Sequence, residues 1–280
     1  MLLSGMCACA VSSAAAVERI VSLAPNLTEL AFAAGAGSRV VGTVEFSDYP
    51  EAARTIPRVG DAFRVDFERL VALRPDAVLA WEPGTPPAVV QRLAELGLNV
   101  VTIATYNVAD VARGLRSMGK LAGTQDAAEN AALSYEREIE QLRTQYSRKA
   151  PVTVFLQIND RPLYTVNGRQ IMSEVLALCG GRNVFAELNE LAPQISVEAV
   201  LARNPQVILS TGDSQPESLT QWRRWKTLPA VRANNLYQVS ADDLARATPR
   251  LARGAQTVCR TLETARQRLG KLQSPEQAQH

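Results

Sequence analysis

The chain of 280 residues contains one histidine, His280, at the very end of a polar tail. This excludes a mechanism that needs a histidine base inside the fold, and it excludes a metal site built from histidines. The sequence also lacks a G-x-S-x-G turn and a phosphate-binding glycine loop. The carboxylates Asp48 and Asp242 could act as an acid–base pair, but nothing in the sequence brings them together. We therefore expect no catalytic residues and no metal ligands, and an α/β enzyme is the less favoured class.

The net charge is small, and long apolar runs are scarce. The formal net charge is +2, and no basic run indicates a nucleic-acid partner. Residues 1–16 carry no charge and end in three alanines, which is typical of the later part of a secretory signal peptide. The usual positive start is missing, which leaves open a start upstream of Met1 or an atypical signal. A lipid anchor on Cys7 or Cys9 is a further alternative, and a membrane-spanning helix is disfavoured by the short length of the stretch.

Beyond the predicted signal peptide the chain has two cysteines, Cys179 and Cys259. An even cysteine count in an exported protein favours a disulfide. Closing a loop of about 80 residues would stabilise the fold by roughly 4 kcal/mol in the chain-entropy view. The alternative is a pair of separately buried thiols.

One stretch occurs twice, at residues 65–80 and again 130 positions later at 195–210. Each copy predicts a short capped helix followed by a buried strand, with Asp66 and Ser196 as the caps. Glu68 and Glu198 fall in the first turn, where the helix dipole favours a negative charge. A single copy would be typical of any α/β protein. Two copies in register predict two similar lobes, each with its own core and an equivalent surface glutamate.

Strands alternate with helices along the chain, which predicts mostly parallel sheets. The longest helical pattern, about 125–147, lies between the two copies and is poor in the residues of a flexible linker. The fold class is therefore α/β, with two Rossmann-like lobes joined by a single long helix. The expected boundaries are 1–16 for the signal peptide, 17–122 and 151–270 for the lobes, 123–150 for the connector and 271–280 for a disordered tail.

Ligands of such sheets bind beyond the carboxyl ends of the strands. Aromatic residues make up only 5% of the chain, so rings in these loops favour a surface for a bulky ligand. Each ring alone is equally compatible with core or rim packing, and Asp242 with Arg246 could simply cap and pair at the start of the last helix. The candidate ligand residues in these loops are Asn26, Phe46, Trp81, Tyr164, Asp242, Asp243, Leu244, Ala245 and Arg246.

Several motifs carry a family resemblance. The segments SLAPNLTEL at 22–30, SDYP at 47–50 and ERLVALRPD at 68–76 resemble the periplasmic substrate-binding proteins of metal-chelate and corrinoid importers. The cobalamin-binding members of that family are the most similar, through VLALCGGRNVF at 175–185, PQIS at 193–196 and RATPR at 246–250. The resemblance covers about residues 18–268. It implies the class III binding-protein fold with a ligand cleft between the lobes, a periplasmic location and a monomer without catalysis.

The resemblance also implies partners and roles. It implies capture of cobalamin or a related corrinoid and delivery to the permease and ATPase subunits of an ABC importer. Phe63 joins the ligand residues, while Ala62 and Ala192 stand where tryptophans are expected, which is compatible with cobinamide or with weaker cobalamin binding. Cys179 and Cys259 match a disulfide, and Glu68 and Glu198 match glutamates that dock on permease arginines. A siderophore or haem carrier is the alternative, with Tyr49, Tyr106 and Tyr164 as possible haem ligands.

Overall fold

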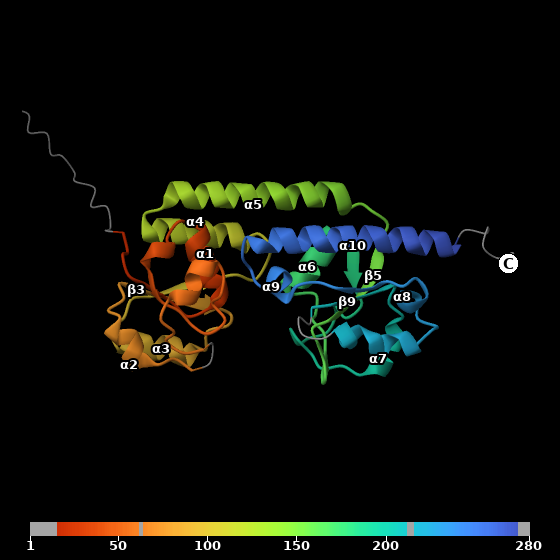
Figure 1. Ribbon diagram of the computed structural model, residues 1–280, viewed down its shortest axis with the longest axis horizontal. Coiled ribbons are helices and arrows are strands. Elements are labelled where there is room, and N and C mark those ends of the chain that lie inside the picture. The colour runs from red at the N-terminus through yellow and green to blue at the C-terminus, as the bar shows by residue number, and fades with distance from the viewer. Residues whose placement is uncertain (1–15, 62–63, 212–215, 274–280) are drawn as a thin grey trace, which may run out of the picture.

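Two α/β lobes lie side by side in the computed structural model, which describes residues 16–61, 64–211 and 216–273 (Figure 1). Each lobe holds a four-stranded sheet in which all neighbours are parallel. The strand order is β2-β1-β3-β4 in the first lobe and β8-β5-β9-β10 in the second. In both sheets the first strand of the lobe lies between the second and the third, and the fourth lies at the edge beside the third. This shared topology confirms the α/β fold and the two lobes expected from the repeat. The strands are β1 (Ile20–Ser22), β2 (Val40–Gly42), β3 (Ala77–Glu82), β4 (Val100–Ala104), β5 (Val152–Gln157), β8 (Gly181–Asn183), β9 (Val207–Ser210) and β10 (Leu236–Gln238).

The repeated stretch folds in the same way in both lobes. Helix α2 (Phe67–Ala72) precedes β3, and α7 (Val197–Arg203) precedes β9. The Asp66 carboxylate accepts a hydrogen bond from the backbone N–H of Arg69 at 2.9 Å, and the Ser196 hydroxyl accepts one from Ala199 at 3.2 Å. Both predicted caps are therefore confirmed. The remaining helices of the lobes are α1 (Pro25–Ala33), α3 (Pro87–Glu95), α4 (Asp110–Ala122), α6 (Ile171–Leu178), α8 (Pro229–Arg232) and α9 (Ala241–Leu244), with an antiparallel hairpin of β6 (Asn159–Asp160) and β7 (Leu163–Tyr164).

Helix α5 (Gln125–Tyr146) is the predicted connector, and it runs along both lobes above α4 and α10 (Figure 1). It packs against α4, α6 and α10. The Tyr135 hydroxyl on this helix donates a hydrogen bond to the Val108 carbonyl at 2.9 Å. The apolar residues of this helix recur at helical spacing and form its buried side, which consists of Ala128, Ala132, Tyr135, Ile139 and Leu142.

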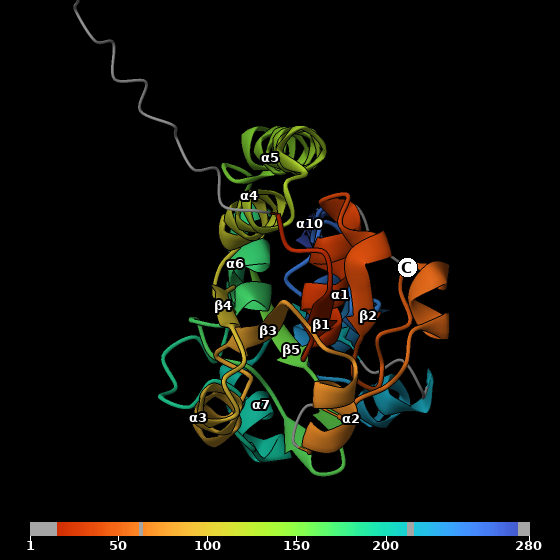
Figure 2. The same cartoon turned by 90° about the vertical axis from the view of Figure 1, so that its left-hand side faces the viewer.

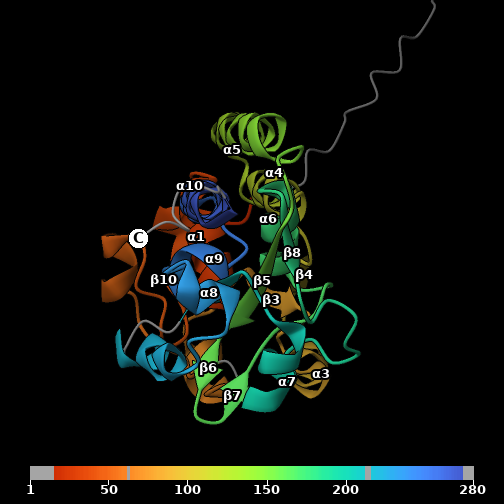
Figure 3. The ribbon, with the colours of Figure 1, turned by 90° about the vertical axis from the view of Figure 1, so that its right-hand side faces the viewer.

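The final helix, α10 (Arg250–Gln273), lies beside α5 (Figure 3) and runs along the second lobe (Figure 1). Its first residue, Arg250, pairs with Glu29 of the first lobe. The largest core cluster includes Leu30 and Leu115 of the first lobe together with Val154 and Leu176 of the second. The expectation of one separate core per lobe is therefore wrong for this part, because α5 packs against α4 of the first lobe and against α6 and α10 of the second. Two smaller clusters each belong to one lobe. A shared, close-packed core opposes large movements of one lobe against the other.

Two of the sequence expectations concern the ends of the chain. Residues 271–273, expected in a disordered tail, belong to α10, and the rest of that tail lies outside the described residues. Most of the predicted signal peptide, with Cys7 and Cys9, also lies outside them. Within the part that the structure describes, no helix combines the length and apolar character needed to cross a bilayer.

Candidate functional site

The predicted ligand residues follow the carboxyl ends of strands in both lobes. Asn26 lies after β1, Phe46 after β2, and Trp81 near the end of β3. Tyr164 lies in the β6–β7 hairpin after β5, and Asp242 begins the segment after β10. Because the strands of each sheet are parallel, these residues share one edge of their sheet, the edge where α/β folds bind ligands.

Phe46 is the most exposed of the predicted aromatic residues. Its side chain is 76% exposed, and its backbone has a φ of 63°, a left-handed conformation that is uncommon for a bulky residue. An exposed ring on strained backbone contributes nothing to core packing. Such strain is typical of segments that are shaped for function, which supports a role in ligand contact.

Trp81 is held in a fixed orientation by residues beside it. Its indole N–H donates a hydrogen bond to the Thr105 hydroxyl at 2.7 Å, and the Asn26 amide lies 3.5 Å from the same oxygen. A Cβ placed on Gly84 would lie 2.0 Å from the Trp81 ring, so the glycine allows the ring to lie against the backbone. Asn26 and Thr105 are both buried. Sequence analysis missed Thr105, although its place directly after β4 matches that of the other strand-end residues.

The two lobes meet at a group of ion pairs. Arg246 pairs with Glu29 at 3.1 Å and with Asp48 at 3.4 Å, both from the first lobe, and with Asp242 of its own lobe at 2.8 Å. Arg250 also holds Glu29, with its Nε 2.8 Å from Oε2. Glu29 and Asp48 follow β1 and β2, while Arg246 follows β10. Segments that follow the carboxyl ends of strands in the two lobes therefore meet at this point.

The same contacts bring Asp48 and Asp242, the carboxylates considered above as an acid–base pair, to one arginine. Both lie on the Arg246 guanidinium, so the structure uses them as ion-pair partners of one cation. Burial alone would lower the pKa of Arg250, but its hydrogen bond to Glu29 and the charges of the nearby aspartates raise that pKa overall. Arg250 therefore stays charged, and Glu29, which is 3% exposed, has a permanent partner.

Replacing Glu29 with glutamine should lower the free energy of unfolding by about 2 kcal/mol, because the largely buried guanidinium of Arg250 would lose the nearest of its anionic partners. Chemical denaturation of the purified protein measures this loss. Glu18→Gln is the matched control, because Glu18 pairs with Arg39 at 3.4 Å but its side chain is 69% exposed. An exposed pair of this kind is worth less than about 1 kcal/mol. Equal losses for the two variants would contradict the prediction.

A hollow of about 410 Å³ opens beside these ion pairs. Residues of α1, of the segment after β2 and of α10 line it, so both lobes contribute. None of the predicted corrinoid-binding residues is among them, so the hollow is lined by other residues than the strand-end site. The lining residues are Glu29, Phe32, Ala33, Tyr49, Pro50, Pro249, Arg250 and Arg253.

Glu68 and Glu198 are both exposed, and each begins an equivalent helix of a different lobe. Helices α2 and α7 lie on the side of the molecule away from α5 (Figure 1 and Figure 2). Hydrogen bonds from its own backbone N–H and from Ser196 lower the pKa of Glu198. The structure thus presents one acidic side chain per lobe on a common side, as a two-fold partner would require.

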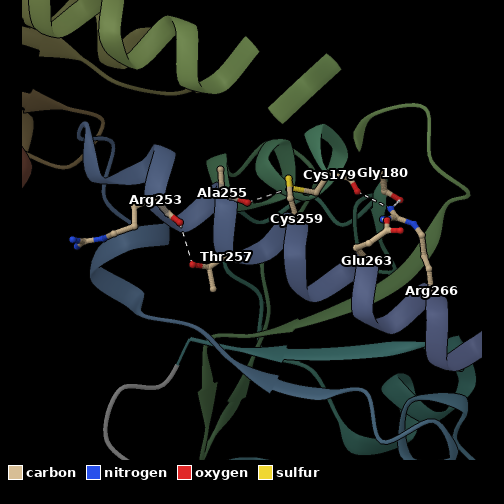
Figure 4. The surroundings of a disulfide bond; sticks show 8 residues. All are labelled: Cys179, Gly180, Arg253, Ala255, Thr257, Cys259, Glu263 and Arg266. Atoms are coloured by element: carbon tan, nitrogen blue, oxygen red, sulfur yellow. Dashed lines mark hydrogen bonds and ion pairs between the residues drawn. A yellow bond between two sulfur atoms is a disulfide. The ribbon is translucent and has the colours of Figure 1, made fainter. Parts of the chain in front are cut away.

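The predicted disulfide joins Cys179 at the end of α6 to Cys259 in α10, with an S–S distance of 2.01 Å (Figure 4). The alternative of two separate thiols is therefore wrong. Ala192 is exposed. Ala62 and Phe63 lie outside the described residues, so the predicted role of Phe63 has no structural account.

Comparison with known proteins adds to this geometry. Residues 20–242 match the family described as periplasmic binding protein. The chain is 35% identical over 249 residues to a vitamin B12-binding protein of Vibrio cholerae, covering 89% of this chain and 90% of that protein. It is 36% identical over 251 residues to a vitamin B12-binding protein of Yersinia pestis, covering 89% and 88%.

Solved structures agree with the sequence relatives. The periplasmic vitamin B12 binding protein of Vibrio cholerae superposes with a TM-score of 0.83 at 34% identity, covering 89% of this chain and 98% of that one. A periplasmic heme binding protein of Pseudomonas aeruginosa gives a TM-score of 0.75 at 25% identity, covering 87% and 91%. The resemblance found in the sequence motifs is thus confirmed along nearly the whole chain, which belongs to the periplasmic binding protein family.

Proposed function

We propose that this protein captures cobalamin or a related corrinoid in the periplasm and delivers it to an ABC importer, without catalysing a reaction. The observation that carries the proposal is its identity of 35% to a vitamin B12-binding protein across 89% of the chain. The fold supports it, because the same chain superposes on a vitamin B12 binding protein with a TM-score of 0.83.

The strand-end residues suit the chemistry of a corrinoid, which is a large flat macrocycle bordered by amide groups. The rings of Phe46, Trp81 and Tyr164 offer stiff apolar area to such a macrocycle. Asp242 and Arg246 offer an acceptor and a donor to its amides. The site therefore combines an apolar surface with a few polar groups, as ligand sites usually do.

Haem is the alternative ligand, supported by the heme binding protein that shares this fold. A tyrosine that binds haem iron does so as a phenolate. Tyr106 donates a hydrogen bond to Glu82 at 2.6 Å, and this bond, together with nearby negative charge, raises its pKa. Tyr49 lies under the Arg250 guanidinium, 4.3 Å from ring centre to cation. Both side chains are already engaged, which leaves Tyr164 as the remaining candidate haem ligand.

The proposal is tested by adding cobalamin to the purified protein and then desalting it. We expect the protein to remain red and to show a corrinoid spectrum. Calorimetric titrations with cobalamin, cobinamide, haem and a ferric siderophore then rank the ligands. Retention of haem or of the siderophore, with neither corrinoid bound, would overturn the proposal.

Replacing Thr105 with valine should weaken corrinoid binding by about tenfold, because the Trp81 indole N–H would lose its acceptor at unchanged side-chain volume. Thr105→Ser keeps the hydroxyl and should retain most of the affinity. Calorimetry measures the affinity, and denaturation checks that both variants are folded. Equal affinities for the valine and serine variants would contradict a positioning role for Thr105.

A further inference from the structure

The group of ion pairs between the lobes, here called the charged seam, holds more carboxylates than guanidinium groups. Each of its arginines is ion-paired within the seam: Arg246 with carboxylates of both lobes, Arg250 with Glu29, and Arg253 with both oxygens of Asp243 at 2.9 and 2.6 Å. The four carboxylates and three guanidinium groups of the seam therefore carry a net formal charge of −1. The members are Glu29, Asp48, Asp242, Asp243, Arg246, Arg250 and Arg253.

The charged seam reaches the predicted ligand surface. Asp242 and Arg246 belong to the predicted ligand segment, and Asp48 lies two residues after Phe46. Their side chains are 36%, 20% and 48% exposed, so a ligand at the strand ends can reach them. Among the described residues, these carboxylates do not form a group able to hold a metal ion.

This arrangement treats neutral and anionic ligand groups differently. An amide can accept a hydrogen bond from Arg246 and donate one to Asp48 or Asp242 without disturbing the ion pairs. A carboxylate must either displace a protein carboxylate from Arg246 or lie beside it, and both are opposed by like-charge repulsion. We infer that the charged seam makes this protein select corrinoids with amide side chains and reject anionic chelates. This inference rests on the proposed function and names the charge class of its ligand.

The test uses two ligands of nearly equal shape: cobalamin and a cobalamin monocarboxylic acid in which one side-chain amide has been hydrolysed. Some positional isomers of the acid place their carboxylate against the charged seam. At neutral pH and low ionic strength, the wild-type protein should bind these isomers about tenfold more weakly than cobalamin. Each positional isomer of the acid is titrated separately. The difference should shrink as salt is added, because the side chains concerned are partly exposed.

Variants then assign the effect to the seam. Asp48→Asn removes one negative charge at almost constant shape, and the ratio of affinities for cobalamin and its acid should fall several-fold toward one. Adding Asp242→Asn should lower the ratio further. The control is Glu138→Gln, which removes a charge from the exposed side of α5 and should leave the ratio as in the wild type. Denaturation of each variant confirms that it is folded.

The outcomes separate the two proposals. If no form of the protein binds cobalamin, the proposed function fails and the inference fails with it. If the wild type binds cobalamin and all the acid isomers equally, the proposed function stands and the inference is overturned. An unchanged ratio in Asp48→Asn and in the double variant also overturns it, because the discrimination would then come from elsewhere.

Discussion

Replacing both Cys179 and Cys259 with alanine should lower the free energy of unfolding by about 4 kcal/mol in the chain-entropy model. The two cysteines are 80 residues apart. The closed loop contains β8, β9 and β10 of the second sheet, so its release frees much of that lobe in the unfolded chain. A loss of this size is a large part of the stability of an ordinary domain.

The variant should still fold, because α10 has other contacts with α6. The Arg266 guanidinium donates hydrogen bonds to the carbonyls of Cys179 at 2.7 Å and Gly180 at 3.2 Å (Figure 4). These bonds cover the free carbonyl end of α6 whether or not the sulfur atoms are joined. We therefore expect near-native circular dichroism with an earlier unfolding midpoint.

Reductant provides the control for the disulfide prediction. Wild-type protein unfolded in the presence of dithiothreitol should lose nearly the same free energy as the double alanine variant loses without it. The variant itself should not respond to dithiothreitol. A variant that unfolds at the wild-type denaturant concentration would contradict the prediction.

The parts of the fold that were predicted correctly depend on local signals. The caps Asp66 and Ser196 act within three residues of themselves, and the buried side of α5 follows from apolar residues at helical spacing. Because the same local signals occur twice in register, they also predicted two similar lobes. Even the exposed positions of Glu68 and Glu198 follow from their place in a capped first turn.

The charged seam could not be predicted in the same way. Glu29 lies 217 residues before Arg246 and 221 before Arg250. On a predicted helix, a single glutamate usually lies on the solvated face, and nothing near it in the sequence indicates burial. Its partners become visible only when the start of α10 and the segment before it meet the first lobe. The shared core has the same origin, since it depends on how α4, α5 and α10 pack and not on the pattern of any one helix.

Reversing both docking charges, in the double variant Glu68→Arg with Glu198→Arg, should reduce delivery to the importer by about a hundredfold or more. If these side chains meet arginines of the permease, as the family resemblance implies, each reversal replaces an attraction with a repulsion. Uptake in cells and binding to the permease in detergent or nanodiscs measure the loss. Each single variant should lose a comparable part of it, because the two positions are equivalent by the repeat.

Corrinoid affinity should stay close to that of the wild type in this double variant. Neither helix contains a predicted ligand residue, and an arginine in a first turn costs only about 0.5 kcal/mol through the helix dipole. Glu138→Arg on α5, on the opposite side of the molecule, is the control and should leave docking intact (Figure 1). Since the pKa of Glu198 is lowered, its charge and the docking that depends on it should persist as the pH falls through the ordinary glutamate range. Loss of corrinoid affinity with docking preserved would place these glutamates in the ligand site and contradict their assignment to the permease.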